Sequence, residues 1–518
     1  MQLIILHGYL LQGTGSNIYV ANIAKAWRKQ GHAVTVVCQD RTAEALPFVE
    51  EFIEPQQPLP HTPPRPGTIR VVSPDINGLL PVYVFDRYDG FEVKTIPDMS
   101  KPEIENHIAM TAATLRQVAS QGATRVLVNH ALLGPVIAKR ALQDMDVPYD
   151  VKIHGSAVEY TLVPHPRLLT YAYEGLEKAE SIFVGTRYVQ ERVLEVFADV
   201  AESLRLKEKL KIVPPGMDPD LFTMTADFVQ SQNRFVDKIR TKIQQNSNGR
   251  NHRRIAEIKV DPNGDLHQKL IELGETYDQR ATDVDLIERW PTLARDEPVI
   301  LYFGKFLGQK GVGEILLTAP TILSAVPQAR FIFVGFGAYR EHLEAMIMAL
   351  GRGDIERFAA CASAGEFIEV RDISRWFRRL EADEIRRITV TGIMDHECLS
   401  ELLPLASLTI VPSKWPEAFG MVAVEAMAAG VLPLCNYHAG LRDVVDEVQI
   451  EEPDIANIMK LDRAKFVHQL PEKVCQALTF LYPDGFDNHS GRRKVGEALR
   501  RIAVEKFSWS GIAKRLLQ

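Results

Sequence analysis

Residues 3–38, LIILHGYLLQGTGSNIYVANIAKAWRKQGHAVTVVC, contain the pattern that decides the fold. Residues 3–6 are a short apolar run, a glycine-containing turn follows, and residues 17–30 have helical periodicity. The β-branched run at 33–38 predicts a second strand. Strand, helix and strand form a βαβ unit, and repeated units of this kind build a parallel sheet covered by helices on both faces.

The same alternation continues along the chain and restarts near residue 299. Helical patterns separate strand-like runs at 69–72, 125–128, 151–153 and 181–184. The second series consists of VILYFG from 299, FIFVGFG from 331, ITVTG from 388, LTIVPS from 408 and VLPLCN from 431. We therefore predict an α/β chain with two facing, Rossmann-like, doubly wound domains. In such sheets, ligands bind at the carboxyl ends of the strands.

The tract KIVPPGMD at 211–218 reads as a strand followed by Pro-Pro-Gly, which suits a crossover between domains. Two polar stretches, at about 220–296 and 351–387, interrupt the α/β pattern and are predicted to be helical insertions in the second domain. We predict an N-terminal domain over residues 1–215, a C-terminal domain over 216–500 and a last helix over 501–518.

Composition excludes several classes of protein. The chain has 518 residues, of which 46% are hydrophobic and 25% charged, as expected for a folded protein. A net charge of −7 argues against a nucleic-acid-coating protein. No apolar run reaches the roughly 18 residues of a membrane span, and the first residues lack the features of a signal peptide. Five scattered cysteines without a C-x-x-C pair exclude a disulfide scaffold. We predict a cytoplasmic protein without stable membrane insertion.

Two motifs in the first domain follow predicted strands. Gly13 and Gly15 flank Thr14 before a helix, where glycine lets the backbone approach a ligand. Ile18 occupies the place of the third glycine of G-x-G-x-x-G, which disfavours a nicotinamide site, and an ordinary tight turn is the alternative. His154 follows the strand at 151–153 and could hydrogen-bond a sugar hydroxyl or cap the next helix. Asn129-His130 is a similar case.

Two lysines follow the first strand of the second domain. Lys305 and Lys310 lie five positions apart in a loop with neighbouring glycines. Two ammonium groups at the carboxyl end of a strand would suit a diphosphate and stabilise charge on a leaving phosphate. Solvated loop lysines are the alternative, because lysine is usually exposed.

The strongest motif is EAFGMVAVEAMAAG at residues 417–430. A helix is predicted to begin near Met421 and to stop at Gly430. Glu417 then lies in the loop before the helix, and Glu425 lies about one turn inside it. Free N–H groups at the helix start could bind phosphate oxygens. Glu425 could accept hydrogen bonds from a vicinal diol, although an acid in an early turn is also favoured by the helix dipole.

Taken together, these motifs resemble the GT4 family of retaining glycosyltransferases, which have the GT-B architecture. The E-x7-E spacing from Glu417 to Glu425, with PEAFG inside it, is the specific feature. The weaker matches are the N-terminal Gly-x-Gly, His154-Gly155, the Pro-Pro-Gly-Met-Asp crossover, Gly304-Lys305 with Lys310-Gly311, and Phe507-Ser508-Trp509 in the last helix.

The resemblance implies a role for each matching residue. Glu425 would hold the ribose of a nucleotide diphosphate sugar, and Lys305 and Lys310 would hold its diphosphate. His154 and Glu417 would bind the transferred sugar. Donor-binding backbone groups would come from Gly13, Gly15, Ala418, Phe419, Gly420, Met421 and Val422. The nucleobase would meet backbone groups around residues 392–394.

The predicted function is therefore transfer of a hexosyl group to an acceptor hydroxyl, with the leaving phosphate taking the acceptor proton on the same face of the sugar. The acceptor could be a small molecule, a saccharide or a lipid-linked group. No cofactor and no metal are expected, because no D-x-D triplet follows a strand of the second domain. A GT-B epimerase, a phosphorylase and a non-catalytic nucleotide-sugar binding protein stay open as alternatives.

Overall fold

The computed structural model describes residues 1–518 except residues 14, 84–87, 89, 252–265, 338 and 365–372. The chain divides into two compact units. The first unit is Met1–Gly216 together with Phe507–Gln518, and the second is Met217–Lys506. The chain therefore returns to its first unit at the C-terminus. The sequence pattern predicts the boundary after residue 215 and the start of the last segment at residue 501, whereas the structure divides the units after Gly216 and at Phe507.

The first unit contains an eight-stranded parallel sheet in the order β10-β9-β8-β7-β1-β2-β4-β3. A separate parallel pair, β5 and β6, follows β4 in the chain. The strands are β1 (Gln2–Leu6), β2 (Ala33–Val37), β3 (Glu51–Ile53), β4 (Ile69–Val72), β5 (Leu79–Val82), β6 (Glu92–Thr95), β7 (Arg125–Asn129), β8 (Tyr149–Ile153), β9 (Ile182–Val184) and β10 (Leu210–Ile212).

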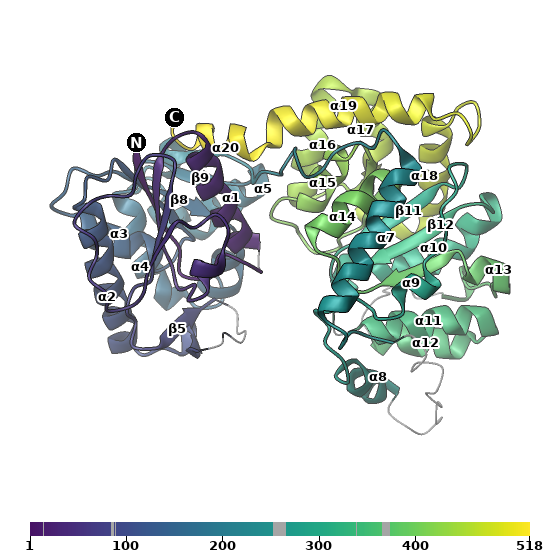
Figure 1. The fold of residues 1–518 in the computed structure, drawn as a ribbon, viewed down its shortest axis with the longest axis horizontal. Helices are drawn as coiled ribbons and strands as arrows, with labels where there is room; N and C mark the ends of the chain where they lie inside the picture. The colour runs from purple at the N-terminus through teal and green to yellow at the C-terminus, as the bar shows by residue number, and fades with distance from the viewer. Residues whose placement is uncertain (14, 84–87, 89, 252–265, 338, 365–372) are drawn as a thin grey trace. The chain divides into compact units, whose positions relative to one another are not determined.

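Helices flank this sheet (Figure 1). They are α1 (Gly15–Lys29), α2 (Lys101–Ala119), α3 (Gly134–Leu142), α4 (Leu169–Glu177), α5 (Arg187–Val196), α6 (Leu206–Lys209) and α20 (Trp509–Arg515). Helix α20 packs on α1, where the indole N–H of Trp27 donates to the carbonyl of Ala513 at 3.0 Å. The ring of Trp509 leaves room only for glycine at position 216, since a Cβ there would lie 2.6 Å from the indole. This contact explains the glycine of the Pro-Pro-Gly tract.

The second unit contains a six-stranded parallel sheet in the order β13-β12-β11-β14-β15-β16. The strands are β11 (Val299–Phe303), β12 (Arg330–Val334), β13 (Ile388–Thr391), β14 (Leu408–Val411), β15 (Leu432–Asn436) and β16 (Lys460–Leu461). Nearly all residues of the first five strands are buried, as expected for a parallel sheet covered on both faces. The strand order reverses between β11 and β14, and doubly wound sheets bind ligands at such a reversal.

Helices cover this second sheet as well, whereas α8 (Leu266–Gly274) packs on other helices (Figure 1). Those in the predicted insertions are α7 (Phe228–Gln245), α8 (Leu266–Gly274), α9 (Leu286–Arg289), α12 (Ile355–Ala364) and α13 (Ala382–Ile385). The others are α10 (Val312–Ala325), α11 (Arg340–Arg352), α14 (His396–Leu402), α15 (Met421–Ala428), α16 (Ala439–Glu451), α17 (Pro453–Met459), α18 (Phe466–Leu481) and α19 (Ser490–Phe507). The described parts of both insertions thus contain helices joined by irregular segments.

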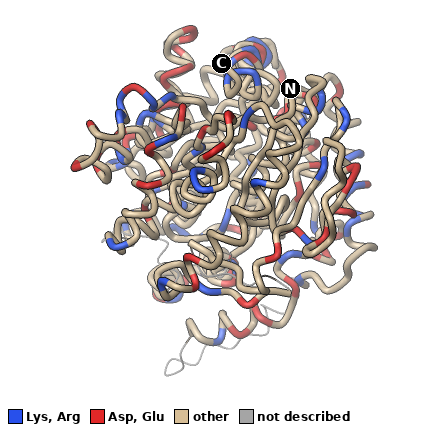
Figure 2. Tube along the Cα trace, turned by 90° about the vertical axis from the view of Figure 1, so that its left-hand side faces the viewer, with Lys and Arg blue, Asp and Glu red and all other residues tan. Residues whose placement is uncertain are grey.

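The surface carries charges of both signs. Figure 2 shows Lys and Arg interspersed with Asp and Glu along the trace. In the part of the chain that the structure describes, no helix combines the length and apolarity that crossing a bilayer requires.

Candidate functional site

Three loops at the carboxyl ends of β11, β14 and β15 meet around the carboxylate of Glu417. Lys310 ends a short helical turn after β11, and its ammonium forms an ion pair with Oε1 of Glu417. The hydroxyl of Ser413, two residues after β14, donates to the same oxygen at 2.7 Å. From the start of α16, which follows β15, the backbone N–H of Gly440 donates to the backbone carbonyl of Glu417 at 2.8 Å. Glu417 is thereby fixed from three sides.

Further contacts join the loops after β11 and β14. The backbone N–H of Lys414 donates to the carbonyl of Gln309 at 2.8 Å, and the Lys414 ammonium lies 2.8 Å from Oε1 of buried Glu314 at the start of α10. A Cβ at position 311 would lie 2.5 Å from the carbonyl oxygen of Pro412. Only glycine therefore allows this approach, which brings Lys310 to Glu417.

The loop after β15 supports the β14 loop from its other side. The side-chain amide of Asn436 donates to the carbonyl of Pro412 at 2.8 Å, and Nε2 of His438 lies 2.7 Å from the carbonyl oxygen of Ser413. A Cβ at Gly440 would lie 2.5 Å from the backbone of Phe419. Ser413, Asn436 and His438 were not predicted as site residues. Each ends or follows a central strand, which is the signal that could have found them.

Helix α15 begins at Met421, as the sequence predicted. Gly420 precedes it with a φ of +126°, a conformation that favours glycine. Met421 and Val422 are half-buried, and N–H groups in a first helical turn have no acceptor within their own helix. Ala418 precedes buried Phe419 in the loop that leads to the helix. A helix start of this kind attracts anions.

Glu425 is the fifth residue of α15 and is only 5% exposed. Burial raises the pKa of its carboxyl to about 8. Nε2 of His396, the first residue of α14, lies 3.8 Å from Oε1 of Glu425. A buried carboxyl beside an imidazole that is half exposed can accept hydrogen bonds from hydroxyl groups of a ligand.

The raised pKa of Glu425 predicts a pH-dependent stability. Between about pH 4.5 and 8 the native state binds more protons than the unfolded chain, so stability falls as the pH rises. The slope contributed by this one group approaches about 1.4 kcal/mol per pH unit. Urea unfolding from pH 5 to 9 should show this slope in the wild type and a flatter dependence in Glu425→Gln. Equal slopes in the wild type and in Glu425→Gln would contradict a raised pKa of Glu425.

Lys305 differs from Lys310 in its surroundings. Its side chain is exposed and forms no ion pair with any residue that the structure describes. The hydroxyl of buried Tyr302 donates to the carbonyl of Lys305 at 2.8 Å, which fixes the backbone of the loop. The structure therefore joins Lys310 to Glu417 and leaves the ammonium of Lys305 in solvent at the same edge of the sheet.

The residues predicted in the first unit lie at the carboxyl ends of its central strands. Nε2 of half-buried His154, one residue after β8, lies 2.8 Å from Oδ1 of Asn129 at the end of β7. Burial, and then the neighbouring His130, lower the pKa of His154 well below its ordinary value, so the imidazole is neutral at pH 7. Gly13 has a φ of +94° and is exposed, and Gly15 is the exposed first residue of α1.

No group of three or more His, Cys, Asp or Glu side chains suited to a metal ion occurs among the residues with described positions.

Comparison with known proteins gives the class of the chain. Residues 375–459 match the family described as glycosyl transferases group 1, and residues 14–204 match the glycosyl transferase 4-like domain. The first match contains Glu417 and Glu425, and the second contains Gly15 and His154.

The chain is also similar to individual proteins. It is 26% identical over 264 residues to the lipopolysaccharide 1,2-N-acetylglucosaminetransferase of Salmonella typhimurium, covering 50% of this chain and 55% of the relative. Sucrose-phosphate synthase of Thermosynechococcus elongatus superposes with a TM-score of 0.55 at 17% identity, covering 100% and 97% of the two chains. HepE of Anabaena, solved in complex with UDP, superposes with a TM-score of 0.54 at 13% sequence identity. This match covers 100% of the present chain and 98% of HepE.

The fold and the site at the strand ends define a protein of the GT-B class, as predicted. The chain belongs to the GT4-type glycosyltransferases. It spans about half the length of the curated relatives it matches.

Proposed function

We propose that the protein is a retaining glycosyltransferase that moves a hexosyl group from a nucleotide diphosphate sugar to an acceptor hydroxyl. The observation that supports this most is the Lys310–Glu417 ion pair beside the first turn of α15, with buried Glu425 farther along the same helix. A cation, a helix start and a diol acceptor thus follow one another along a single edge of the sheet. In the proposed donor the diphosphate lies between the sugar and the ribose. Glu417 would therefore meet the sugar, Lys310 and the helix start would meet the diphosphate, and Glu425 would meet the ribose.

In the proposed reaction, the bond between C1 of the sugar and the phosphate oxygen breaks while the acceptor oxygen bonds to C1 on the same face. The acceptor proton passes to the leaving phosphate oxygen, so no protein nucleophile is needed. Lys310 and Lys305, with the first-turn N–H groups of Met421 and Val422, stabilise the charge that develops on the diphosphate. Glu417 binds the sugar, and Glu425 accepts hydrogen bonds from the ribose. These cations take the place of a metal ion in the proposal.

We further propose that His154 binds a substrate hydroxyl at the edge of the first sheet. Its neutral ring is held by Asn129 and lies against Tyr19, with ring centroids 4.9 Å apart. The acceptor class, whether a small molecule, a saccharide or a lipid-linked group, is not specified by these residues. A cytoplasmic location stays a prediction from the scattered cysteines.

UDP is the first nucleotide to test, because HepE was solved with UDP. UDP should raise the melting temperature of the wild type by mass action. Glu425→Ala should weaken UDP binding by about tenfold, since the variant loses both carboxyl oxygens that would hydrogen-bond the ribose. Isothermal calorimetry measures both affinities, and Glu497→Gln, an exposed change on α19, is the control. Failure of UDP, GDP and ADP to bind would overturn the proposal.

The alternatives predict different products. An epimerase would convert a nucleotide sugar into its isomer without any acceptor, and NMR of the donor would detect that isomer. A non-catalytic binding protein would leave the donor intact. The proposed transferase should instead hydrolyse the donor slowly, releasing the nucleoside diphosphate.

A further inference from the structure

The insertion between β10 and β11 contacts the connection from β13 to α14 at two places. We define the insertion clamp as α7 together with residues 281–289, and neither family match includes it. The two places lie on either side of residues 393–394, which follow β13.

Helix α7 holds the start of α14. Nζ of Lys242 lies 2.6 Å from Oδ2 of Asp395, and Oδ1 of the same carboxylate accepts a hydrogen bond from the backbone N–H of Cys398 at 2.9 Å. One turn earlier, Lys238 donates to the carbonyl of Glu397 at 3.0 Å. Burial alone would raise the pKa of Asp395, but Lys242 and the N–H of Cys398 lower it, so this carboxylate is ionised at neutral pH.

Residues 281–289 hold the end of β13. Nη1 of Arg289 donates to the carbonyl of Val390 at 2.6 Å. A Cβ at Gly392 would lie 2.5 Å from Oδ1 of Asp283, so the carboxylate packs directly against the backbone of this residue. The first residue after the strand is therefore held by a group from the insertion.

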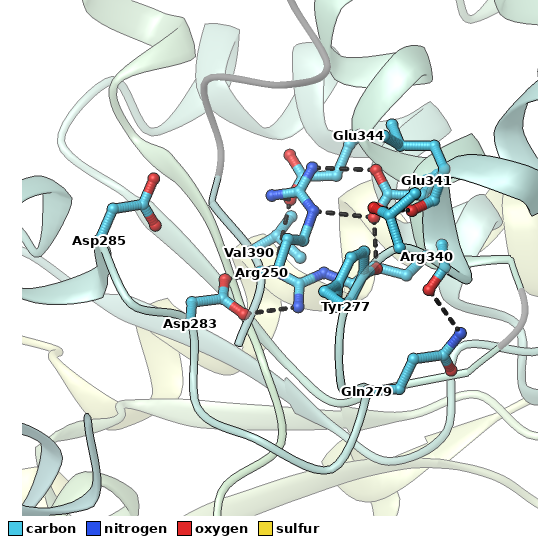
Figure 3. A network of polar contacts seen from close by, with 12 residues as sticks. Arg250, Tyr277, Gln279, Asp283, Asp285, Arg340, Glu341, Glu344 and Val390 are labelled. Carbon is cyan, nitrogen blue, oxygen red and sulfur yellow. Dashed lines mark hydrogen bonds and ion pairs between the residues drawn. The ribbon is translucent and has the colours of Figure 1, made fainter. Parts of the chain in front are cut away.

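A buried ion-pair network anchors Asp283 (Figure 3). Arg340, the first residue of α11, donates to both carboxylate oxygens of Asp283, and Nη1 lies 2.7 Å from Oδ1. Arg250 donates to both oxygens of Glu341, at 2.8 and 3.1 Å, and Glu341 accepts the hydroxyl of Tyr277 at 2.5 Å. These charged side chains are at most 5% exposed. Residues 281–289 of the clamp are thus anchored to α11 by buried ion pairs.

The held connection leads to the proposed ribose site. Ile393 and Met394 are half-buried, and Asp395 and His396 are exposed. His396 reaches to within 3.8 Å of Glu425, the proposed ribose ligand. A base joined to a ribose at Glu425 would meet this connection, because the two groups are adjacent in any nucleotide.

We propose that the insertion clamp positions the β13–α14 connection so that it selects the nucleobase of the donor, with Lys242 and Asp283 as positioning residues. The inference rests on the proposed function, since it requires a nucleotide ribose at Glu425. It assigns to the insertion a role in base selectivity and none in diphosphate binding.

The test compares three full-length variants, Lys242→Met, Asp283→Asn and the control Arg240→Met. Arg240 lies on α7 and pairs with Asp237 of the same helix, with a side chain 54% exposed. Calorimetry with UDP, GDP, ADP and inorganic pyrophosphate gives four affinities for each protein. Lys242→Met should reduce the preference for the best nucleotide over the second by about tenfold, because small displacements of binding groups have effects of this size or larger. Pyrophosphate affinity should stay unchanged.

Asp283→Asn should change selectivity in the same direction, and Arg240→Met should match the wild type. An unchanged nucleotide preference in Lys242→Met would overturn the inference, even if Asp283→Asn does not fold. An equal loss of affinity for all three nucleotides and for pyrophosphate would also overturn the inference, because that result indicates general damage to the binding site. Absence of any nucleotide binding in the wild type would instead refute the proposed function.

Discussion

Lys310→Ala should lower kcat for glycosyl transfer by about 10²–10³-fold, the usual loss when one group that stabilises transition-state charge is removed. Lys310 forms an ion pair with Glu417, and the Lys310 side chain is 33% exposed. A diphosphate that leaves during the reaction gains charge, and an ammonium nearby stabilises the transition state more than the bound donor. The loss should therefore fall mainly on kcat and less on KM.

The control for Lys310→Ala is Lys494→Ala, an exposed change on α19, which should leave kcat unaltered. Steady-state release of the nucleoside diphosphate measures both variants, and thermal unfolding checks that they remain folded. A kcat within threefold of wild type in Lys310→Ala would exclude Lys310 from the reaction. In that case exposed Lys305 would be the cation to test next.

Much of the fold could be predicted because the strands are apolar runs separated by amphipathic helices. Strands β1, β2 and β4 begin or end within a residue or so of the predicted runs. The start of α15 at Met421 could be predicted from local chemistry, since a glycine precedes a run of good helix formers. Such features depend on residues that are neighbours in the chain.

Other features depend on partners that are distant in the chain. The strands β3, β5, β6 and β16 were not predicted, because runs of two to four residues carry little periodicity. The contact between Lys310 and Glu417 spans 107 positions, and that between Arg250 and Glu341 spans 91. The sequence indicated a polar insertion at 220–296, but nothing in its local pattern indicated that Arg250 and Asp283 would be buried.

The buried position of Asp283 leads to the largest expected effect on stability. Asp283→Ala should lower the free energy of unfolding by about 3–5 kcal/mol, the usual cost of removing one partner from a buried ion pair. The side chain of Asp283 is 0% exposed, and it forms ion pairs with the guanidinium groups of Arg340 and Arg289. Burial alone would raise the pKa of Asp283, but the arginines, Arg340 first, lower it. The contribution is therefore present at neutral pH and is lost as the pH falls through the lowered pKa.

Urea unfolding at pH 7 measures the effect, with Asp237→Ala as the matched control. Asp237 belongs to the same insertion, but its side chain is 71% exposed and pairs only with Arg240 among the contacts described, so its loss should cost no more than about 0.5 kcal/mol. A difference below about 1 kcal/mol between the two variants would mean that water reaches Arg340 and Arg289 when the carboxylate is removed. Such a result would contradict a rigid anchor on α11, because a region that admits water on losing one carboxylate could not hold Gly392 in place.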